Sequence, residues 1–291
     1  MPSGGARAPP DARVPETHVQ WGNHVTQFQG KVVAITGAGS GIGRALAQNL
    51  AARGAKLALA GLTLDGLEET VALLPHGTHA TCTALDVSNR VNVFAFADAV
   101  IADFGQVDYI INNAGTSVLA SVENVTIEEI EKVINVNMWG VVFGTKAFLP
   151  IMLKQRSGTI VNVSSVFGLV ATPCSVAYTM SKFAVRGLTE TLWDELQGTG
   201  VRAVLVHPGG IATNIAANTP IAKHEGALER KLAAANSAQM TTPPEVCAQE
   251  IVAGLIRGDN RLLVGSGAKA LFRLSRLFPN SYGKLIRKKL G

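Results

Sequence analysis

The sequence holds little charge, few cysteines and no long apolar run. Only 16% of its 291 residues are charged and 47% are hydrophobic, a balance that excludes an intrinsically disordered chain. The three cysteines, Cys82, Cys174 and Cys247, are odd in number and far apart, so they predict neither a disulfide framework nor a metal site. No apolar run reaches the roughly 18 residues that a membrane span needs. We therefore expect a globular protein of a reducing compartment, the cytoplasm, with no bound metal.

The two ends of the chain differ from its middle. Residues 1–28 are rich in proline, glycine and polar side chains and lack the apolar core of a secretion signal, which predicts a flexible tail. Acidic residues are absent from position 269 onward, whereas seven basic residues occur there: Lys269, Arg273, Arg276, Lys284, Arg287, Lys288 and Lys289. The rest of the chain has 19 basic residues against 21 acidic ones, so we expect no binding of nucleic acid.

Residues 266–291 predict a basic amphipathic extension, because leucine and phenylalanine alternate with the basic cluster. One interpretation is a helix that packs on the domain or on a neighbouring subunit, with its basic side chains in water. The other is a helix that lies on an acidic membrane surface. Pro279 interrupts the apolar face and favours packing.

Between the two ends, short apolar segments alternate with segments of helical periodicity. The predicted strands are 31–36, 56–61, 80–87, 107–115, 158–165, 201–210 and 261–265, and the helices between them include 126–136 and 137–154. This alternation predicts an α/β fold of the Rossmann type, a doubly wound, seven-stranded and mostly parallel sheet with helices on both faces. Nothing divides residues 29–265, so we expect one domain, whose ligands bind beyond the carboxyl ends of the strands.

A glycine-rich turn follows the first predicted strand and opens a helix. Gly37, Gly41 and Gly43 let the backbone turn tightly and approach a pyrophosphate at the N-terminus of the helix. A turn with spare glycines is the alternative. The strand before it and the helix after it favour a dinucleotide site.

The spacing of the turn, Gly-x-x-x-Gly-x-Gly, is followed in order by several short motifs. These are Asp86 after the third strand, Asn112-Asn-Ala-Gly115, Asn137, Ser165, Tyr178-x-x-x-Lys182, and Pro208-Gly209 with Thr213. With this ordered set the sequence resembles the short-chain dehydrogenase/reductase family, in its branch of single-domain oxidoreductases. The resemblance covers about residues 29–265 and implies an enzyme that uses NAD or NADP, with association into a homodimer or homotetramer through the helices that carry Asn137 and Tyr178.

The resemblance also implies which residues hold the cofactor. The turn would contribute Gly37, Ser40, Gly41, Ile42 and Gly43. Asp86 and Val87 would contact the adenine, and Asn113, Ala114 and Gly115 would pass beside the ribose, although this segment could also serve only as a strand-ending turn. The nicotinamide end would be bordered by Tyr178, Lys182, Pro208, Gly209, Ile211 and Thr213.

The second strand bears on the choice between NAD and NADP. An acidic residue at its end binds the ribose 2′-hydroxyl of NAD, whereas a basic residue there or in the turn accommodates the 2′-phosphate of NADP. The end of the second strand is occupied by Gly61, Leu62 and Thr63, and the position in the turn by Ser40, so neither holds an acidic or a basic residue. Loss of the acid removes repulsion of the phosphate, Thr63 can donate to it and Arg44 is near in sequence. We expect NADP, with NAD as the alternative.

Tyr178 and Lys182 lie one helical turn apart. A free phenol, with a pKa of about 10, is a poor base at neutral pH. An ammonium group beside it stabilises the phenolate and lowers that pKa. The resemblance assigns Tyr178 as general acid and base, Lys182 as its activator, Ser165 as the group that orients the substrate and Asn137 as the holder of a relay water. From the residues alone, Ser164 could replace Ser165, and Asn137 could cap or kink its helix.

The substrate is predicted to be a hydrophobic alcohol or ketone, such as a steroid, terpenoid, lipid-derived or xenobiotic carbonyl compound. Residues 211–241 predict a lid, with Lys223 and His224 as the groups that could act on closure. The pocket is predicted to be lined by Val166, Phe167, Val170 and Pro173. A different class of protein stays open, a non-catalytic sensor of dinucleotides or a scaffold on the same fold.

Overall fold

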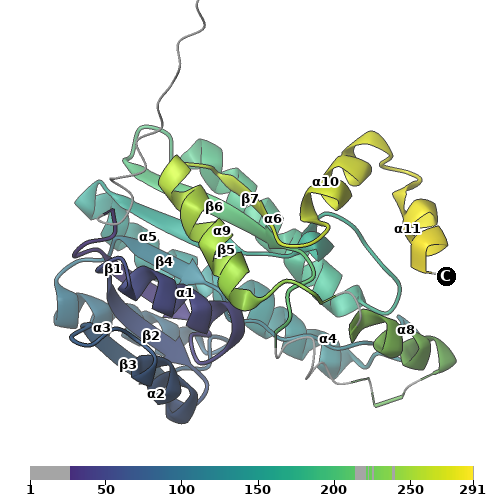
Figure 1. Cartoon of the computed structure of the whole chain (residues 1–291), viewed down its shortest axis with the longest axis horizontal. Helices are drawn as coiled ribbons and strands as arrows, with labels where there is room; N and C mark the ends of the chain where they lie inside the picture. The colour runs from purple at the N-terminus through teal and green to yellow at the C-terminus, as the bar shows by residue number, and fades with distance from the viewer. Residues whose placement is uncertain (1–26, 214–220, 222, 225, 238–239, 291) are drawn as a thin grey trace, which may run out of the picture.

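The fold is a parallel sheet with helices on both faces (Figure 1). The computed structural model describes residues 27–213, 221, 223–224, 226–237 and 240–290. Its strands are β1 (Val32–Thr36), β2 (Lys56–Gly61), β3 (Ala80–Ala84), β4 (Tyr109–Asn112), β5 (Gly158–Val163), β6 (Val201–Pro208) and β7 (Arg261–Val264). Their order is β3-β2-β1-β4-β5-β6-β7, and every neighbouring pair is parallel. The predicted Rossmann-type fold is confirmed, and the described sheet is parallel throughout rather than mostly so.

The order of the strands reverses between β1 and β4. From β1 the chain runs outward through β2 to β3, and it then returns to place β4 on the other side of β1. Ile35 of β1 pairs with Ile111 of β4, so the carboxyl ends of these strands, at Thr36 and Asn112, lie together. In such sheets a ligand crevice opens at this point, because the two connections leave in opposite directions.

Two helical layers bury the sheet. On one face α1 (Gly41–Ala51) packs beside α9 (Pro244–Arg257), and on the other α3 (Arg90–Phe104), α5 (Gly140–Gln155) and α6 (Val176–Glu195) cover the strands. Strand β1 supplies both layers, because Val33 and Ile35 join the first core and Val32 and Ala34 the second. The other helical segments are α2 (Leu64–Ala72), α4 (Ile127–Ile134), the π-helical segment η2 (Asn135–Trp139), the 3-10 turn η3 (Val166–Gly168), α8 (Ala227–Ser237), α10 (Ala268–Leu277) and α11 (Tyr282–Leu290).

The helices predicted over 126–136 and 137–154 are joined into one. Segments α4, η2 and α5 run without a break from Ile127 to Gln155, and the π turn at Asn135–Trp139 replaces the expected boundary. This 29-residue helix contains an 18-residue window with a mean hydropathy of 1.4, and it is the one helix in the described part of the chain whose length and composition would allow a membrane crossing. Phe148 and Met152 of this helix are fully buried under the sheet, so it serves here as a core helix.

The predicted start of the domain is too late. Phe28, assigned to the flexible tail, is 1% exposed and lies 5.3 Å from the Tyr109 ring, centroid to centroid. The Phe28 carbonyl accepts a hydrogen bond from the Lys31 N–H group. The domain therefore includes Phe28, because its side chain completes the core beneath β1 and β4. Residues 1–26 of the predicted tail lie outside the described residues.

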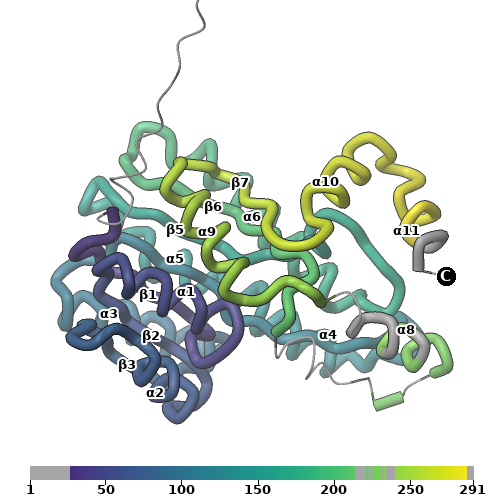
Figure 2. The backbone as a smooth tube through the Cα atoms, in the orientation of Figure 1, coloured from purple at the N-terminus to yellow at the C-terminus, as the bar shows by residue number. Residues whose placement is uncertain are grey.

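The C-terminal extension forms two helices that project from the body beyond β7 (Figures 1 and 2). The first, α10, packs against β7 and η3, with Ala268 fully buried. The second, α11, touches the loop after η3, where the Ala171 N–H group donates to Tyr282 Oη (3.2 Å). The basic Lys269, Arg273, Arg276 and Lys284 are exposed. The two helices thus combine packing on the domain with basic side chains in water.

Candidate active site

The glycine-rich turn is closely packed against the end of β4. Gly37 has φ +67°, and a Cβ atom placed on it would lie 2.8 Å from the Cα atom of Ala114. A Cβ atom on Gly43 would overlap the carbonyl group of Gly37. Ser40 precedes α1 without a side-chain hydrogen bond to it, and the first turn of α1 has no acidic residue. The free N–H groups of this helix end can therefore bind a phosphate group.

The two asparagines that follow β4 have structural partners. Asn112 Nδ2 donates to Asn162 Oδ1 (2.8 Å) across the sheet. Asn113 Nδ2 donates to the carbonyl groups of Thr36 (3.0 Å) and Gly37 (3.2 Å). The alternative of a strand-ending turn thus accounts for both side chains, because they join β4 to β5 and to the glycine-rich turn. Asn113 also borders the groove described next.

A groove runs over the switch point, along the carboxyl ends of β1 to β4. The predicted cofactor residues that line it are Gly37, Ser40, Gly41, Ile42, Gly61, Leu62, Thr63, Asp86, Val87, Asn113, Ala114, Gly115 and Thr213. Gly43 lies outside the lining of the groove. Its lack of a side chain lets the start of α1 pack closely against the carbonyl group of Gly37. The prediction missed Gly39, Gly66, Leu85, Thr116, Ser117, Lys132 and Val136. Thr116 and Ser117 directly follow Gly115 and could have been included, whereas Lys132 and Val136 are brought in by the packing of α4 and η2.

Arg44 does not reach the groove, which corrects its expected role. Its Nε donates to Thr70 Oγ1 (3.0 Å), and its second guanidinium nitrogen donates to Glu69 (2.7 Å) and to the Gly66 carbonyl (3.2 Å). These partners belong to α2, and the same nitrogen also donates to the Gly39 carbonyl, so the guanidinium holds α2 against the glycine-rich turn. Arg44 is absent from the described lining of the groove, and its expected help in binding a 2′-phosphate finds no support in this arrangement.

The end of β2 is open and uncharged. Leu62 is 77% exposed, and Thr63 precedes α2 without a side-chain hydrogen bond to that helix. The carboxylate in the described lining of the groove is that of Asp86, whose Oδ1 accepts hydrogen bonds from Ser88 N (2.9 Å) and Ser88 Oγ (2.7 Å). The place where an acid would bind a 2′-hydroxyl group is thus held by neutral groups.

Tyr178 and Lys182 share a buried face of α6. Burial lowers the pKa of Lys182, which is 3% exposed, to about 8. Lys182 Nζ donates to the Val163 carbonyl (3.0 Å) and lies 5.5 Å from the centre of the Tyr178 ring. Burial also raises the pKa of the Tyr178 phenol, and the Ser165 hydroxyl opposes that shift. The pKa of Tyr178 therefore differs from the expectation, because desolvation outweighs its neighbours and the lysine makes its hydrogen bond to the main chain.

The two serines after β5 have different partners. Ser164 Oγ is 2.9 Å from the Lys182 carbonyl and donates to it, so this side chain ties β5 to α6. Ser165 Oγ accepts a hydrogen bond from Phe167 N (3.2 Å) and keeps its own proton for another partner. Phe167 in turn packs edge-on against Tyr178, with ring centroids 5.6 Å apart. Of the two serines, Ser165 is the one whose hydroxyl can donate into the cavity beside Tyr178.

Asn137 lies within the π-helical segment and is fully buried. Its Nδ2 donates to the Thr116 carbonyl (2.8 Å) and to Ser181 Oγ (3.0 Å), and its Oδ1 accepts from the Thr116 N–H group (2.8 Å). Both amide protons thus join the loop after β4 to α6. The alternative that Asn137 caps or kinks its helix is replaced by a π-helical segment in a continuous helix. The part of Asn137 in a proton relay stays a prediction.

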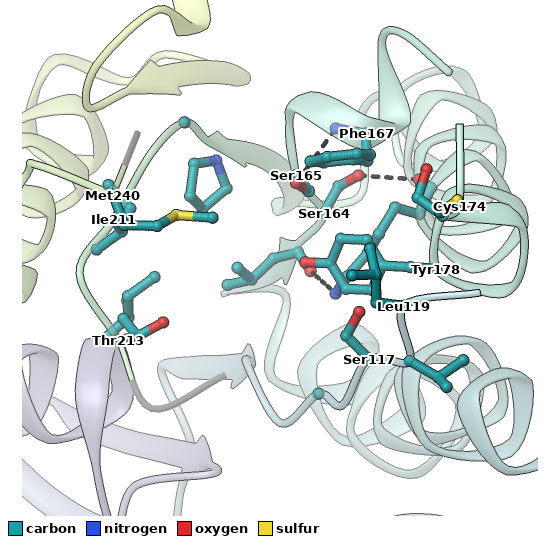
Figure 3. A pocket seen from close by; sticks show the side chains of 18 of the residues that line it. Ser117, Leu119, Ser164, Ser165, Phe167, Cys174, Tyr178, Ile211, Thr213 and Met240 are labelled. Atoms are coloured by element: carbon teal, nitrogen blue, oxygen red, sulfur yellow. Dashed lines mark hydrogen bonds between the residues drawn. The ribbon is translucent and has the colours of Figure 1, made fainter. Parts of the chain in front are cut away.

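The groove opens into a cavity of about 340 Å³ beside Tyr178. Figure 3 shows Ser165, Phe167 and Tyr178 on one side of it and Ile211, Thr213 and Met240 on the other. Pro208 and Gly209 also line this cavity rather than the groove. Lys182 is the one charged side chain in its described lining, so the cavity suits a neutral, mostly apolar ligand.

Only one of the four predicted pocket residues lines this cavity. Phe167 does, but Val166 and Val170 are buried in the core behind it and Pro173 is exposed to solvent. The turn η3 accounts for Val166 and Phe167, because in a 3-10 turn these successive side chains point in different directions, whereas Val170 and Pro173 lie in the loop after it. Outside these four residues and the predicted lid, the lining also includes Ser117, Val118, Leu119, Val163, Cys174 and Ser175.

The predicted lid borders the cavity where it is described. Ile211, Thr213, Ile221, Ala233 and Met240 contribute to the lining, while residues 214–220, 222, 225 and 238–239 lie outside the described residues. The lid helix α8 is held by Glu229, which accepts hydrogen bonds from Ser121 N (2.9 Å) and Asn124 Nδ2 (2.9 Å). These two donors lower the pKa of Glu229 to about 2.

The two polar residues expected to act on closure lie elsewhere. Lys223 and His224 are exposed and outside the lining of the cavity. The Lys223 N–H group donates to Glu129 Oε1 (3.1 Å) instead. The predicted role of these two side chains on closure therefore finds no support in this arrangement.

Comparison with known proteins agrees with this geometry. Residues 31–223 match the family model described as short chain dehydrogenase. A Mycobacterium tuberculosis (strain H37Rv) protein named as an oxidoreductase, SadH, is 45% identical over 271 residues, which cover 90% of this chain and 96% of that protein. Human estradiol 17-beta-dehydrogenase 11 is 33% identical over 266 residues, with 90% of this chain and 84% of that protein covered.

A solved structure gives the same result. A short-chain dehydrogenase/reductase from Burkholderia phymatum, in complex with NAD, superposes with a TM-score of 0.79 at 33% identity, covering 86% of this chain and 94% of that one. The family match, the identities and the structural superposition thus point to one family. This chain belongs to the short-chain dehydrogenase/reductase family of oxidoreductases, which act on CH–OH groups.

Proposed function

We propose that this protein transfers a hydride between a nicotinamide dinucleotide and a hydrophobic secondary alcohol or ketone, with Tyr178 as general acid and base. The observation that carries the proposal is the continuity of two spaces. Five residues, Ile42, Asn113, Gly115, Ser117 and Thr213, line both the groove and the apolar cavity. A dinucleotide in the groove would thus present one end to a ligand in the cavity, next to Tyr178.

The groove fits the dinucleotide on this chain's own geometry. The packing around Gly37 and Gly43 leaves no room for side chains, and the N–H groups at the start of α1 are free to bind a pyrophosphate. Pro208, Gly209 and Ile211 would border the nicotinamide, which supplies the hydride chemistry when bound. Asp86 and Val87 would border the adenine, and Ala114 and Gly115 the ribose.

The protein's part is to move a proton and to orient the carbonyl oxygen. In the reducing direction the Tyr178 hydroxyl donates its proton to the substrate oxygen as the hydride adds to the carbon. The Ser165 hydroxyl donates a second hydrogen bond to that oxygen while negative charge develops on it. The ammonium group of Lys182, buried beside the tyrosine ring, stabilises the phenolate that remains. Asn137 would hold the water through which the proton is replaced.

The substrate class follows from the cavity. Ile42, Leu119, Phe167, Ile211 and Met240 offer apolar surface, and no carboxylate or arginine appears in the described lining. A steroid, terpenoid, lipid-derived or xenobiotic carbonyl compound fits such a space, and a charged hydroxy acid does not. The test is a panel of ketones and alcohols, read by nicotinamide absorbance. A preference for small charged hydroxy acids would contradict the proposal.

For the cofactor we propose NADP rather than NAD. The end of β2 carries no acid that would repel a 2′-phosphate, and the Thr63 hydroxyl is available to donate to it. Titration with NADPH and NADH, followed by fluorescence, measures the preference. Tighter binding of NADH would reverse this assignment and leave the proposed reaction unaffected.

We also propose that the protein forms a homodimer or homotetramer through α5 and α6. Around these helices Trp139, Leu153, Met180 and Phe183 are between 38% and 50% exposed, and an interface there would bury their apolar surface. Light scattering on the purified protein measures the assembly. A monomer at micromolar concentration would contradict this proposal.

A further inference from the structure

A buried polar network lies behind Ser165. His207, the last residue but one of β6, is fully buried, and its Nδ1 lies 2.7 Å from the Ser165 carbonyl oxygen. Its Nε2 lies 3.3 Å from a terminal nitrogen of Arg261 on β7. The network thus reaches the main chain of the serine beside Tyr178, while His207 and Arg261 stay outside the described lining of the cavity.

The partners of His207 decide which ring nitrogen carries the proton. A guanidinium group can only donate, so Nε2 must accept from Arg261. Nδ1 then carries the hydrogen and donates to the Ser165 carbonyl. Burial lowers the pKa of His207 to about 4, with the charges of Arg261 and Arg186 adding to the effect and Glu190 opposing it. The ring is therefore neutral, and in one tautomer, at physiological pH.

Arg261 is itself held from several sides. It donates to Glu190 Oε1 (2.6 Å), which also accepts from Arg186 Nε (2.7 Å). The Arg261 guanidinium lies 5.0 Å from the centre of the Trp193 ring and 5.4 Å from that of Phe272. These side chains come from α6 and α10, whereas Arg261 itself lies on β7. The position of the arginine, and through it that of His207, therefore depends on three elements of the fold.

We propose that His207 is a positioning residue for Ser165, held in the donating tautomer by Arg261. The side chain of Ser165 accepts from Phe167 N, and its carbonyl accepts from His207. Both ends of the residue are therefore fixed, with the hydroxyl directed to the cavity. The proposal rests on the proposed function for its kinetic consequence, but the arrangement itself has a readout that needs no turnover.

The readout without turnover is the ionisation of Tyr178. The Ser165 hydroxyl lowers the pKa of that phenol, so displacement of Ser165 raises it. Protein labelled with ¹³C at tyrosine Cζ reports each of the three tyrosines separately by NMR. We expect His207→Leu to raise the pKa of Tyr178 in the same direction as Ser165→Ala. We expect His207→Asn, whose Nδ2 can still donate to the carbonyl, to leave it near the wild-type value.

The kinetic readout separates positioning from binding. If Ser165 moves, we expect kcat for the best ketone of the panel to fall about tenfold to a hundredfold in His207→Leu, with unchanged affinity for the dinucleotide. His207→Asn should recover most of the loss. Thr189→Val is the matched control, because it breaks a buried hydrogen bond of α6 to Asn162 that does not touch Ser165.

Two further outcomes keep the tests distinct. If His207→Leu does not fold, Arg261→Met removes the donor to Nε2, and ¹⁵N NMR of His207 should then lose its fixed tautomer. A wild-type protein without activity on any alcohol or ketone overturns the proposed function, while the tyrosine titration still decides the role of His207. A Tyr178 pKa and a kcat that are the same in wild type and His207→Leu overturn the positioning role.

Discussion

The half of the site that binds the dinucleotide and the half that binds the substrate are built in different ways. The groove is formed largely by the main chain, with glycines at Gly37, Gly39, Gly41, Gly61 and Gly115 in its lining. The cavity is formed by side chains from the loop after β4, from η3 and α6, and from the lid, and these three parts are well separated in the sequence. A main-chain site needs particular backbone conformations, whereas a side-chain site can change its specificity through single substitutions.

The largest effect is expected where the two halves meet, at Tyr178. In Tyr178→Phe the substrate oxygen has no proton donor, so we expect turnover to fall at least about a hundredfold. The ring and its packing against Phe167 remain, and cofactor affinity should stay near that of wild type. Steady-state kinetics and a fluorescence titration of the cofactor measure the two quantities. Retained turnover would refute the assigned mechanism.

A large effect confined to the groove is expected from Gly37→Ala. The added Cβ atom would meet the Ala114 main chain in a left-handed conformation, so we expect cofactor affinity to fall about tenfold or more, with a loss of ~1–3 kcal/mol in the free energy of unfolding. Gly77→Ala is the matched control, because Gly77 also has positive φ but no atom near its Cβ position. Equal cofactor affinity in both variants would show that binding in the groove does not depend on the backbone conformation at Gly37, against the contrast drawn between the two halves of the site.

An intermediate effect concerns the pH dependence of stability. The pKa of His207 is about 4 in the folded protein, below its ordinary value of 6.5, so the unfolded state binds more protons between these values. Stability should therefore fall as pH decreases from 6.5 to 4, by about 3 kcal/mol for this group. Denaturant unfolding of wild type and His207→Asn across this pH range isolates the contribution of His207 to the free energy of unfolding. Parallel curves for the two proteins would show that His207 does not contribute.

The smallest effect is expected from the C-terminal extension. Because α10 packs on β7 and η3, we expect co-sedimentation with anionic liposomes at low salt to be equal for the full chain and for a variant that ends at Gly267. None of the described residues removed by this truncation lines the cavity, so we expect substrate KM to change by less than about tenfold. Binding of the full chain alone to the liposomes would support the membrane alternative.

The groove could be predicted in larger part than the cavity. The residues after β1, β2 and β3 line the groove because each follows directly on a strand that the apolar pattern identifies. Val166, Val170 and Pro173 do not line the cavity, because the side-chain directions in η3 and in the loop after it depend on packing against α6 and α10. Cys174 lines the cavity with φ +57°, a backbone conformation that no local pattern indicates.

The sequence by itself determined the order of strands and helices, the glycine-rich turn and the spacing of Ser165, Tyr178 and Lys182, since these depend on local periodicity and short motifs. Only the tertiary structure decided which side chains serve the site. It directed Arg44 to α2 and His207 to the back of Ser165, and it assigned Ser164 to the main chain of α6. The physical reason is that a long or buried polar side chain takes the partners that folding brings near it, and those partners are distant in the sequence.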